Sequence, residues 1–273
     1  MAAVNVSNFW EFYDAITNAP DGGIYEVNCP ENAIWDMNEI DPTGSISDIN
    51  LRYGAYIHGN GTTLKNYHGS INKQNTGSTR EENFDHFHFE NMLATGESAF
   101  SRCNFSQCKI SVQCGVNTRY LADYAVFLQC SINVDAQAST FRIIDVSAGT
   151  YTLSWYCQYC RIEVNAPNVT GAFPTVEADY RPGEELFCEL IYHVPSAAGL
   201  QTGYQKNCTI RGEMASVTSI TFRGSDQTVI CSDSMDSLDI ETIAEENRKW
   251  LVTDAQLRDI DYLHSIGFVI GSE

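Results

Sequence analysis

The sequence predicts an all-β protein, a single-stranded parallel β-helix with an N-terminal capping helix and a short α-helical C-terminal segment. First, a short phrase recurs around cysteines at positions 108, 130, 160, 188, 208 and 231, in steps of 22, 30, 28, 20 and 23 residues. Second, apolar and polar residues alternate within each phrase, which is typical of a strand buried on one face. Third, the insertions between phrases are polar and contain few helix signals, so each repeat supplies strands to one coil of a solenoid.

The best-matched phrases are near copies of one another. Residues 107–112, 129–134, 159–164 and 207–212 all place cysteine second and isoleucine fourth. Stacked coils bring equivalent residues to the strand spacing of about 4.8 Å, and free cysteine is among the most buried residue types. We therefore interpret the thiols as core packing, with a metal or redox role as the alternative. The predicted structural core ladder is Cys108, Cys130, Cys160, Cys188, Cys208 and Cys231.

The N-terminal element is a helix within residues 1–22 that covers one end of the solenoid. Ser7 is the expected N-cap, and apolar residues follow at the i, i+3, i+4 and i+7 positions of one helix face. These apolar residues are Phe9, Phe12, Tyr13 and Ile16. Strands are expected at 24–27 and 55–58, and the β-helix itself extends over residues 23–232.

The second of these strands leads into Ile-His-Gly-Asn-Gly-Thr-Thr-Leu at 57–64. A short amphipathic helix, a glycine turn, a first strand and an I-x-G-N-G-x-T-L phrase resemble the opening of the pectin-lyase-like right-handed β-helix proteins. The resemblance covers residues 1–232 and includes the phrases at 89–91 and 103–108. It implies a right-handed coil, with any bound polysaccharide lying along one parallel sheet.

Residues 233–273 differ in character, because cysteine, aromatic and glycine content falls while acids and helix formers increase. Thr253 and Gln256 form a capping box, and Gly267 is placed to end the helix that follows. Residues 233–261 contain nine acids against three basic residues. We interpret this segment as an acidic docking module rather than only a solvated helix face.

Composition and charge exclude several classes of protein. Of 273 residues, 43% are hydrophobic and 19% charged, which is unlike a disordered chain or a coiled coil. The net charge of −19 repels phosphate backbones, so nucleic acid is not an expected partner. No apolar run approaches the roughly 20 residues that span a bilayer, and membrane insertion is not expected. The first residues lack signal-peptide features, so we expect synthesis in the cytoplasm, with most of the ten cysteines as free thiols.

The resemblance to pectin-lyase-like enzymes raises the question of catalysis. The polygalacturonase-type phrases, Asn-Thr-Asp, Asp-Asp, Gly-His-Gly and Arg-Ile-Lys, are absent, and Glu163 follows Arg161 and Ile162. The lyase phrase needs two arginines around a proline, and Arg181 stands alone before Pro182. We therefore predict no catalytic residue and no cofactor, and favour a protein that is not an enzyme. A carboxylate pair assembled from separate coils stays open, because it leaves no local spacing in the sequence.

One weak metal-ligand candidate is a pair of histidines. His86 and His88 alternate with phenylalanines, so a regular strand would place both imidazoles on its outer face. Glu90 shares that face and Asp85 does not. Zinc needs a third and usually a fourth ligand. We predict a solvated or subunit-facing histidine pair, and keep His86, His88 and Glu90 as the weaker metal-site interpretation.

The weak candidates for ligand binding are Trp155, Tyr156 and Tyr159, because exposed aromatic faces can stack on sugar rings. Aromatic residues at strand spacing more often pack in a core or an interface, and both interpretations stay open. Cys157 and Cys160 form a C-x-x-C pair beside them, but this pair falls inside the repeat phrase. Redox or zinc chemistry is therefore the minor alternative there.

Residues 253–259 and 262–268 resemble the tails of certain phage and prophage virion proteins. The resemblance implies a structural virion protein of a tailed bacteriophage: a capsid decoration protein, head fibre, or tail or baseplate component. Such a protein is expected to contact other virion proteins, to form a homotrimer by analogy, and to bind a receptor or host surface glycan. One alternative is a polysaccharide depolymerase, a lyase or hydrolase that acts on host surface glycan. Another is a non-catalytic glycan-binding adhesin with a groove of exposed tyrosines.

Overall fold

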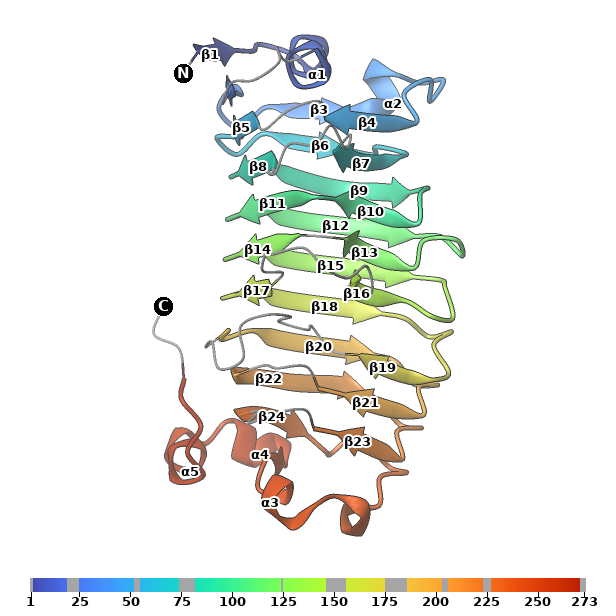
Figure 1. Ribbon diagram of the computed structural model, residues 1–273, viewed down its shortest axis with the longest axis vertical. Coiled ribbons are helices and arrows are strands. Elements are labelled where there is room, and N and C mark those ends of the chain that lie inside the picture. The colour runs from blue at the N-terminus through green and yellow to red at the C-terminus, as the bar shows by residue number, and fades with distance from the viewer. Residues whose placement is uncertain are drawn as a thin grey trace.

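The computed structural model describes residues 2–18, 25–51, 55–73, 82–123, 125–145, 156–174, 186–202, 206–222 and 227–270. They form a right-handed parallel β-helix, with α1 and the C-terminal helices at opposite ends of the stack (Figure 1). Strands pair in parallel in each of the sheets. The predicted fold class is therefore confirmed.

Successive coils contribute strands in turn to three walls of the solenoid. The seven-stranded sheet contains β1 (Ala2–Asn5), β2 (Tyr25–Asn28), β5 (Ala55–His58), β8 (Glu82–Asp85), β11 (Cys103–Ser106), β14 (Val126–Leu128) and β17 (Tyr156–Gln158). The ten-stranded sheet contains β3 (Ile34–Asp36), β6 (Thr63–Lys65), β9 (His88–Ala94), β12 (Lys109–Cys114), β15 (Ser131–Ala136), β18 (Arg161–Asn165), β20 (Glu189–His193), β22 (Lys206–Glu213), β24 (Gln227–Cys231) and β25 (Leu251–Val252).

The third wall is divided between two sheets. The five-stranded sheet contains β4 (Asp48–Leu51), β7 (Ser70–Lys73), β10 (Ser98–Ser101), β13 (Tyr120–Asp123) and β16 (Arg142–Asp145). The three-stranded sheet contains β19 (Ala172–Pro174), β21 (Gly199–Gln201) and β23 (Ser219–Thr221). Each inward-facing position along these walls becomes a column of side chains, because successive strands are in register.

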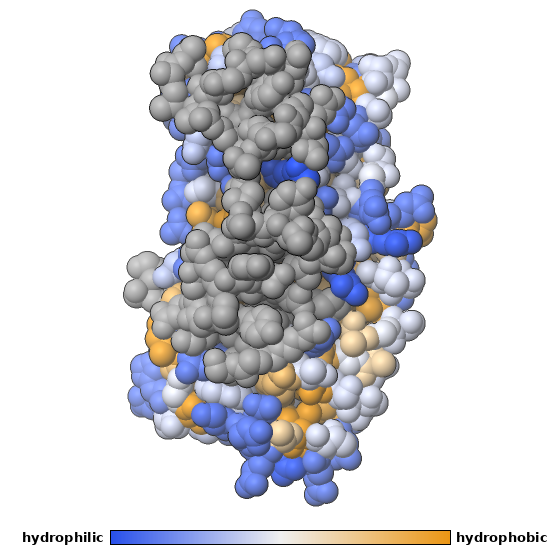
Figure 2. Space-filling model, in the orientation of Figure 1, coloured by the Kyte–Doolittle hydropathy of each residue, from blue (hydrophilic) through white to orange (hydrophobic). Residues whose placement is uncertain are grey.

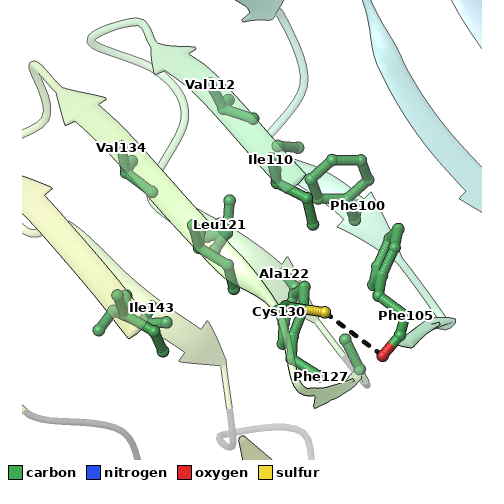
Figure 3. Close-up of a cluster of buried hydrophobic side chains, with 14 of the residues drawn as sticks. Phe100, Phe105, Ile110, Val112, Leu121, Ala122, Phe127, Cys130, Val134 and Ile143 are labelled. Atoms are coloured by element: carbon green, nitrogen blue, oxygen red, sulfur yellow. Dashed lines mark hydrogen bonds between the residues drawn. The ribbon is translucent and has the colours of Figure 1, made fainter. Parts of the chain in front are cut away.

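These columns fill the interior of the solenoid. In the ten-stranded sheet, one buried column runs through the register partners Ile110, Ile132, Ile162, Leu190 and Ile210. In the seven-stranded sheet, the rings of Phe84, Phe105 and Phe127 stack with centroids 5.3 and 5.0 Å apart. Figure 3 shows Phe105, Ile110 and Phe127 meeting in this core. Burying each such side chain stabilises the fold by about 1.5–3 kcal/mol, so every coil is held by its neighbours.

A single residue with φ between 50° and 55° forms a corner at the start of the ten-stranded-sheet strand in six described coils, and in the first four of these it follows a strand of the seven-stranded sheet. This left-handed conformation turns the chain sharply, and non-glycine residues adopt it at a cost of about 1–2 kcal/mol. We call these residues the corner column. They are His86, Gln107, Gln129, Tyr159, Phe187 and Asn207. All except Asn207 are exposed or half-buried.

A buried cysteine follows the corner residue in five successive coils, Cys108, Cys130, Cys160, Cys188 and Cys208. The thiols of the first four lie 3.1–3.6 Å from a main-chain carbonyl oxygen of the preceding coil. Figure 3 shows one such contact, from Cys130 to Phe105. A thiol is a weak donor, so cysteine adds a hydrogen bond that alanine could not make at this crowded position.

Cys231 does not belong to this ladder, and its predicted membership is wrong. Thr209 pairs with Val229, which makes buried Thr228 the equivalent of Cys208. Cys231 lies three residues further along β24, and an odd shift places a residue on the opposite face of a strand. It is nevertheless buried, because β25 pairs beside it. The step of 23 residues lies within the range of the other steps, so spacing alone did not reveal the change of face.

At the N-terminal end, α1 (Phe9–Thr17) covers the first coils, as predicted. Its N-cap is Asn8 and not Ser7: the Asn8 side chain accepts a hydrogen bond from the Glu11 main-chain N–H at 3.1 Å. Ser7 instead donates to the Glu11 carboxylate. Buried rings of α1 pack against Trp35. Strand β1, which the sequence did not predict, extends the seven-stranded sheet beyond β2, and the short α2 (Met37–Ile40) follows β3.

The C-terminal segment closes the other end of the solenoid. Its elements are the 3₁₀ turn η1 (Ile240–Thr242), α3 (Glu245–Arg248), β25, α4 (Asp254–Leu257) and α5 (Ile260–Ser265). Trp250, Val252, Leu263 and Phe268 form a second hydrophobic cluster with Val229 of β24. The predicted capping box at the start of α4 is confirmed. None of the helices in the described ranges is long and apolar enough to cross a membrane.

Candidate ligand-binding groove

A groove of about 740 Å³ follows the corner column beside the ten-stranded sheet. Corner residues of successive coils form one wall, and outward residues of β18, β20 and β22 form the other. The C-terminal tail, residues 267–270, lies beside β20 and β22 at the end nearest the C-terminal helices (Figure 1). The lining residues are Gln107, Gln129, Tyr159, Cys160, Arg161, Phe187, Cys188, Glu189, Asn207, Thr209, Phe268 and Ile270.

The middle of the groove presents two stacked aromatic rings. Tyr159 and Phe187 occupy corner positions of successive coils, with φ of 53° and 50°. Their ring centroids are 5.2 Å apart and their planes are inclined by only 13°. The Tyr159 side chain is 44% exposed. The corner conformation directs both rings away from the core, and the register of the coils brings them together.

Amides continue the corner column towards the N-terminal end. The Gln107 side-chain amide donates to the Gln129 side-chain oxygen at 3.0 Å. This bond uses one donor and one acceptor, so the other polar atoms of the two amides are available to a ligand. The groove therefore combines an aromatic surface with neutral hydrogen-bonding groups.

A network of charged side chains flanks the aromatic pair. Arg161 lies 2.8 Å from one oxygen of Glu189, and Arg211 donates to the other oxygen through both Nε and a terminal nitrogen, at 3.1 and 2.8 Å. Arg161 also contacts Glu163 at 3.1 Å. His193 extends the network, with Nε2 3.5 Å from the same Glu163 carboxylate. Each arginine thus has a carboxylate partner within the sheet.

Burial of Glu189 disfavours its ionised form, but hydrogen bonds and charge from Arg211 and Arg161 outweigh this effect and lower the pKa of the carboxyl. Glu189 is therefore ionised at neutral pH. An ionised carboxylate can accept hydrogen bonds from hydroxyl groups. It cannot protonate the leaving oxygen of a glycosidic bond, which hydrolysis requires of a general acid.

The structure describes only part of the predicted aromatic ligand-binding site. Tyr159 lines the groove. Trp155 lies outside the described residues, and for Tyr156 only the main chain, in β17, is described. Phe187 was missed in the sequence analysis as a groove-lining residue, although it precedes a repeat cysteine just as Tyr159 does. That shared position was the available signal, because equivalent corner residues become neighbours once the coils stack.

The predicted histidine pair is not arranged as expected. His86 is a corner residue with φ 50°, so it does not share a regular strand face with His88. Its Nδ1 lies 3.0 Å from Asp85, while His88 Nδ1 accepts the Lys109 main-chain N–H at 3.1 Å. Glu90, on the outer face of β9 as predicted, pairs with a lysine at 2.8 Å. Within the described ranges, no group of three or more His, Cys, Asp or Glu side chains is placed to hold a metal.

The C-x-x-C pair lies in the packed interior. Cys157 and Cys160 are both buried, and the Cys157 carbonyl oxygen accepts from the Cys188 thiol at 3.1 Å. Burial raises the pKa of the Cys157, Cys160 and Cys188 thiols, which keeps them protonated and poorly reactive. These contacts support the packing interpretation of the cysteines.

The groove as a whole is suited to holding an extended, uncharged, hydroxyl-rich molecule. It offers aromatic faces, amides and ion-paired polar groups along a rigid support, and its described carboxylate Glu189 is held in the ionised state.

Comparisons of the chain with protein-family models, with curated proteins and with solved structures found no match.

Proposed function

We propose that this protein is a non-catalytic, glycan-binding structural component of a tailed-phage particle, a stiff rod whose corner groove holds a neutral host surface glycan. The stacked pair of exposed Tyr159 and half-buried Phe187 carries the glycan-binding part of the proposal. Aromatic faces stack on the apolar faces of sugar rings, while neighbouring polar groups bind the hydroxyls.

The dimensions of the groove support an oligosaccharide rather than a single sugar. The corner column from Gln107 to Asn207 spans four strand steps, or roughly 19 Å at about 4.8 Å per step. Parallel coils bonded to both neighbours keep these positions at fixed spacing. Successive sugar units of a polysaccharide would thus lie beside successive residues of the corner column.

The charge of the protein supports a neutral ligand. The net charge of −19 opposes an acidic polysaccharide, and Arg161 and Arg211 are each already paired with Glu189. An uncharged glycan avoids both problems, because its hydroxyls can bond to the paired groups without separating them.

The depolymerase alternative ranks second. Glycoside hydrolysis commonly needs one protonated and one ionised carboxyl group flanking the bond. Glu189, the carboxylate that lines the groove, has a lowered pKa. This favours holding a glycan over cutting it.

The particle location rests on the resemblance of the C-terminal phrases to virion-protein tails and on the closed form of the rod. α1 covers one end and the C-terminal segment the other, so neither end presents a full open stack for further coils. Attachment to other virion proteins through the acidic outer side of the C-terminal segment, and association as a homotrimer, are parts of the same proposal.

Two measurements test the proposal. We expect the purified chain to bind neutral glycans on an array of bacterial surface polysaccharides, without releasing reducing ends or unsaturated products. Absence of binding across the array would refute glycan recognition, and turnover would favour the depolymerase. Copy counting by quantitative mass spectrometry of purified phage particles, with the native mass of the chain, tests the particle role; a soluble monomer absent from particles contradicts it.

A further inference from the structure

The last corner position of the groove is covered, unlike those before it. Asn207 continues the corner column below Phe187, with φ 55°. Its side chain lines the groove but is only 3% exposed. The C-terminal tail lies over this position, with Phe268 and Ile270 as further lining residues.

The polar atoms of Asn207 are poorly satisfied under this cover. The side-chain oxygen Oδ1 accepts one long hydrogen bond, 3.3 Å, from the Val269 main-chain N–H. The amide nitrogen Nδ2 is buried and has no hydrogen-bond partner. A buried donor without a partner is destabilising, and such groups in folded proteins call for an explanation.

The tail is firmly held only up to Phe268. Phe268 is buried in the C-terminal hydrophobic cluster, whereas Val269 and Ile270 are 46% and 43% exposed although they lie against the groove. Figure 2 shows hydrophobic residues at the left edge of the lower half, where Figure 1 places this tail. Gly267, the first residue of the tail, has φ 87° and open space where a side chain would be. The polar contact between Val269 and the groove is the long hydrogen bond from its main-chain N–H to Asn207.

We propose that Asn207 is a further sugar-binding position of the groove and that Val269 and Ile270 are a displaceable cover over it. Once the cover is displaced, a sugar hydroxyl matches the Asn207 amide, because it can accept from Nδ2 and a neighbouring hydroxyl can donate to Oδ1. Binding there would satisfy the donor that the cover leaves unpaired. This inference rests on the proposed glycan-binding function and adds a position and a competitor to it.

The test uses the full chain with the anchor removed. Val269→Pro deletes the N–H that bonds to Asn207, and Val269→Ala keeps that N–H as the matched control. The probe is the neutral array glycan with the strongest signal, titrated in solution. We expect Val269→Pro to bind it about two- to tenfold more tightly, the range of one ordinary hydrogen bond, and Val269→Ala to bind like the parent.

A second variant guards against an indirect effect of proline. A chain that ends at Phe268 retains the cluster residue and should show the same gain. Adding Asn207→Gly, which suits the left-handed corner, should abolish the gain in both backgrounds. Unchanged or weaker binding by both uncovered variants would overturn the displaceable cover.

Hydrogen exchange supplies a readout that needs no glycan. We expect the Val269 amide to exchange much faster than the amides of β22, and faster still after Asn207→Gly. Protection equal to that of β22 would show that the tail is a fixed part of the fold and overturn the inference. If glycan binding depends on Tyr159 but not on the tail, only this inference fails; if no glycan binds, the proposed function fails with it.

Discussion

The ring of Tyr159 lies over the ring of Phe187, with centroids 5.2 Å apart and planes inclined by 13°. The two residues meet because each occupies the left-handed corner of its coil and the following strands are in register. Stacking on each other restricts both rings, and in the proposed function this lowers the entropy lost on binding a glycan. Residues at the same position of two sequence repeats thus form one continuous aromatic surface.

Tyr159→Ala should weaken binding of a neutral array glycan about tenfold or more, the loss typical of an aromatic anchor at a binding hot spot. Tyr56→Ala is the matched control: Tyr56 is also 44% exposed but lies on β5, away from the groove lining. Titration calorimetry measures both affinities, and thermal unfolding checks that both variants fold. Equal losses in the two variants would contradict a specific role for the stacked pair.

The thiol ladder gives a prediction about stability. Cys130→Asp should destabilise the fold by more than about 4 kcal/mol, because it buries an unpaired carboxyl between stacked coils. Cys130→Ala should cost about 1–2 kcal/mol through lost packing. Ser131→Asp is the control, since the next residue in the chain is half-buried on the outward face of β15. Urea unfolding measures all three, and equal effects at the two positions would refute the ladder.

The interior was predictable because its signal is local. Alternation within one phrase identifies Ile132 and Val134 as inward residues without knowledge of any other coil. The repeat then identifies the stack. The same reasoning failed at Cys231, since a recurring thiol does not by itself reveal which face of the strand it occupies.

The groove was less predictable because it depends on the corner conformation and on contacts between coils. Glycine or asparagine would have indicated a left-handed corner, but glutamine, tyrosine and phenylalanine occupy several of these positions. Histidine does not indicate such a corner either, and for this reason His86 was predicted to lie in a regular strand. Phe187 is identified as part of the groove only by its stacking on Tyr159 of the neighbouring coil. Asn207 is identified only by its contact with the C-terminal tail, which is distant in the sequence.

The corner conformation itself can be tested at Gln129, where φ is 52°. Gln129→Val should destabilise the fold by about 1–2 kcal/mol, because a β-branched residue is strained at positive φ. Gln129→Gly should stay within about 1 kcal/mol of the parent, since relief of that strain offsets the lost bond to Gln107. Asn133→Val, on the outward face of β15, should be tolerated. Urea unfolding that ranks the valine variant at 129 as stable as the glycine variant would contradict a left-handed corner.

Glu189 gives a prediction about pH. Its pKa in the folded protein is lowered from an ordinary value of 4.5, since Arg211 and Arg161 outweigh the opposing effect of burial. Its ionised form therefore contributes stability that is full above 4.5 and is lost as the pH falls through the folded pKa. The difference in unfolding free energy between the parent and Glu189→Gln should be constant near neutral pH and shrink in acid.

Replacing both Arg161 and Arg211 by glutamine reverses this expectation. Without the two cations, burial is the main influence on Glu189, and it raises rather than lowers the pKa of the carboxyl. In that background, Glu189→Gln should increase the unfolding free energy at neutral pH, because it removes a half-buried charge that has lost its partners. Urea titrations at several pH values compare the two backgrounds. The same sign of effect in both would mean that the arginines do not control this carboxylate, and that the groove wall is not the ion-paired surface on which the proposed recognition of a neutral glycan depends.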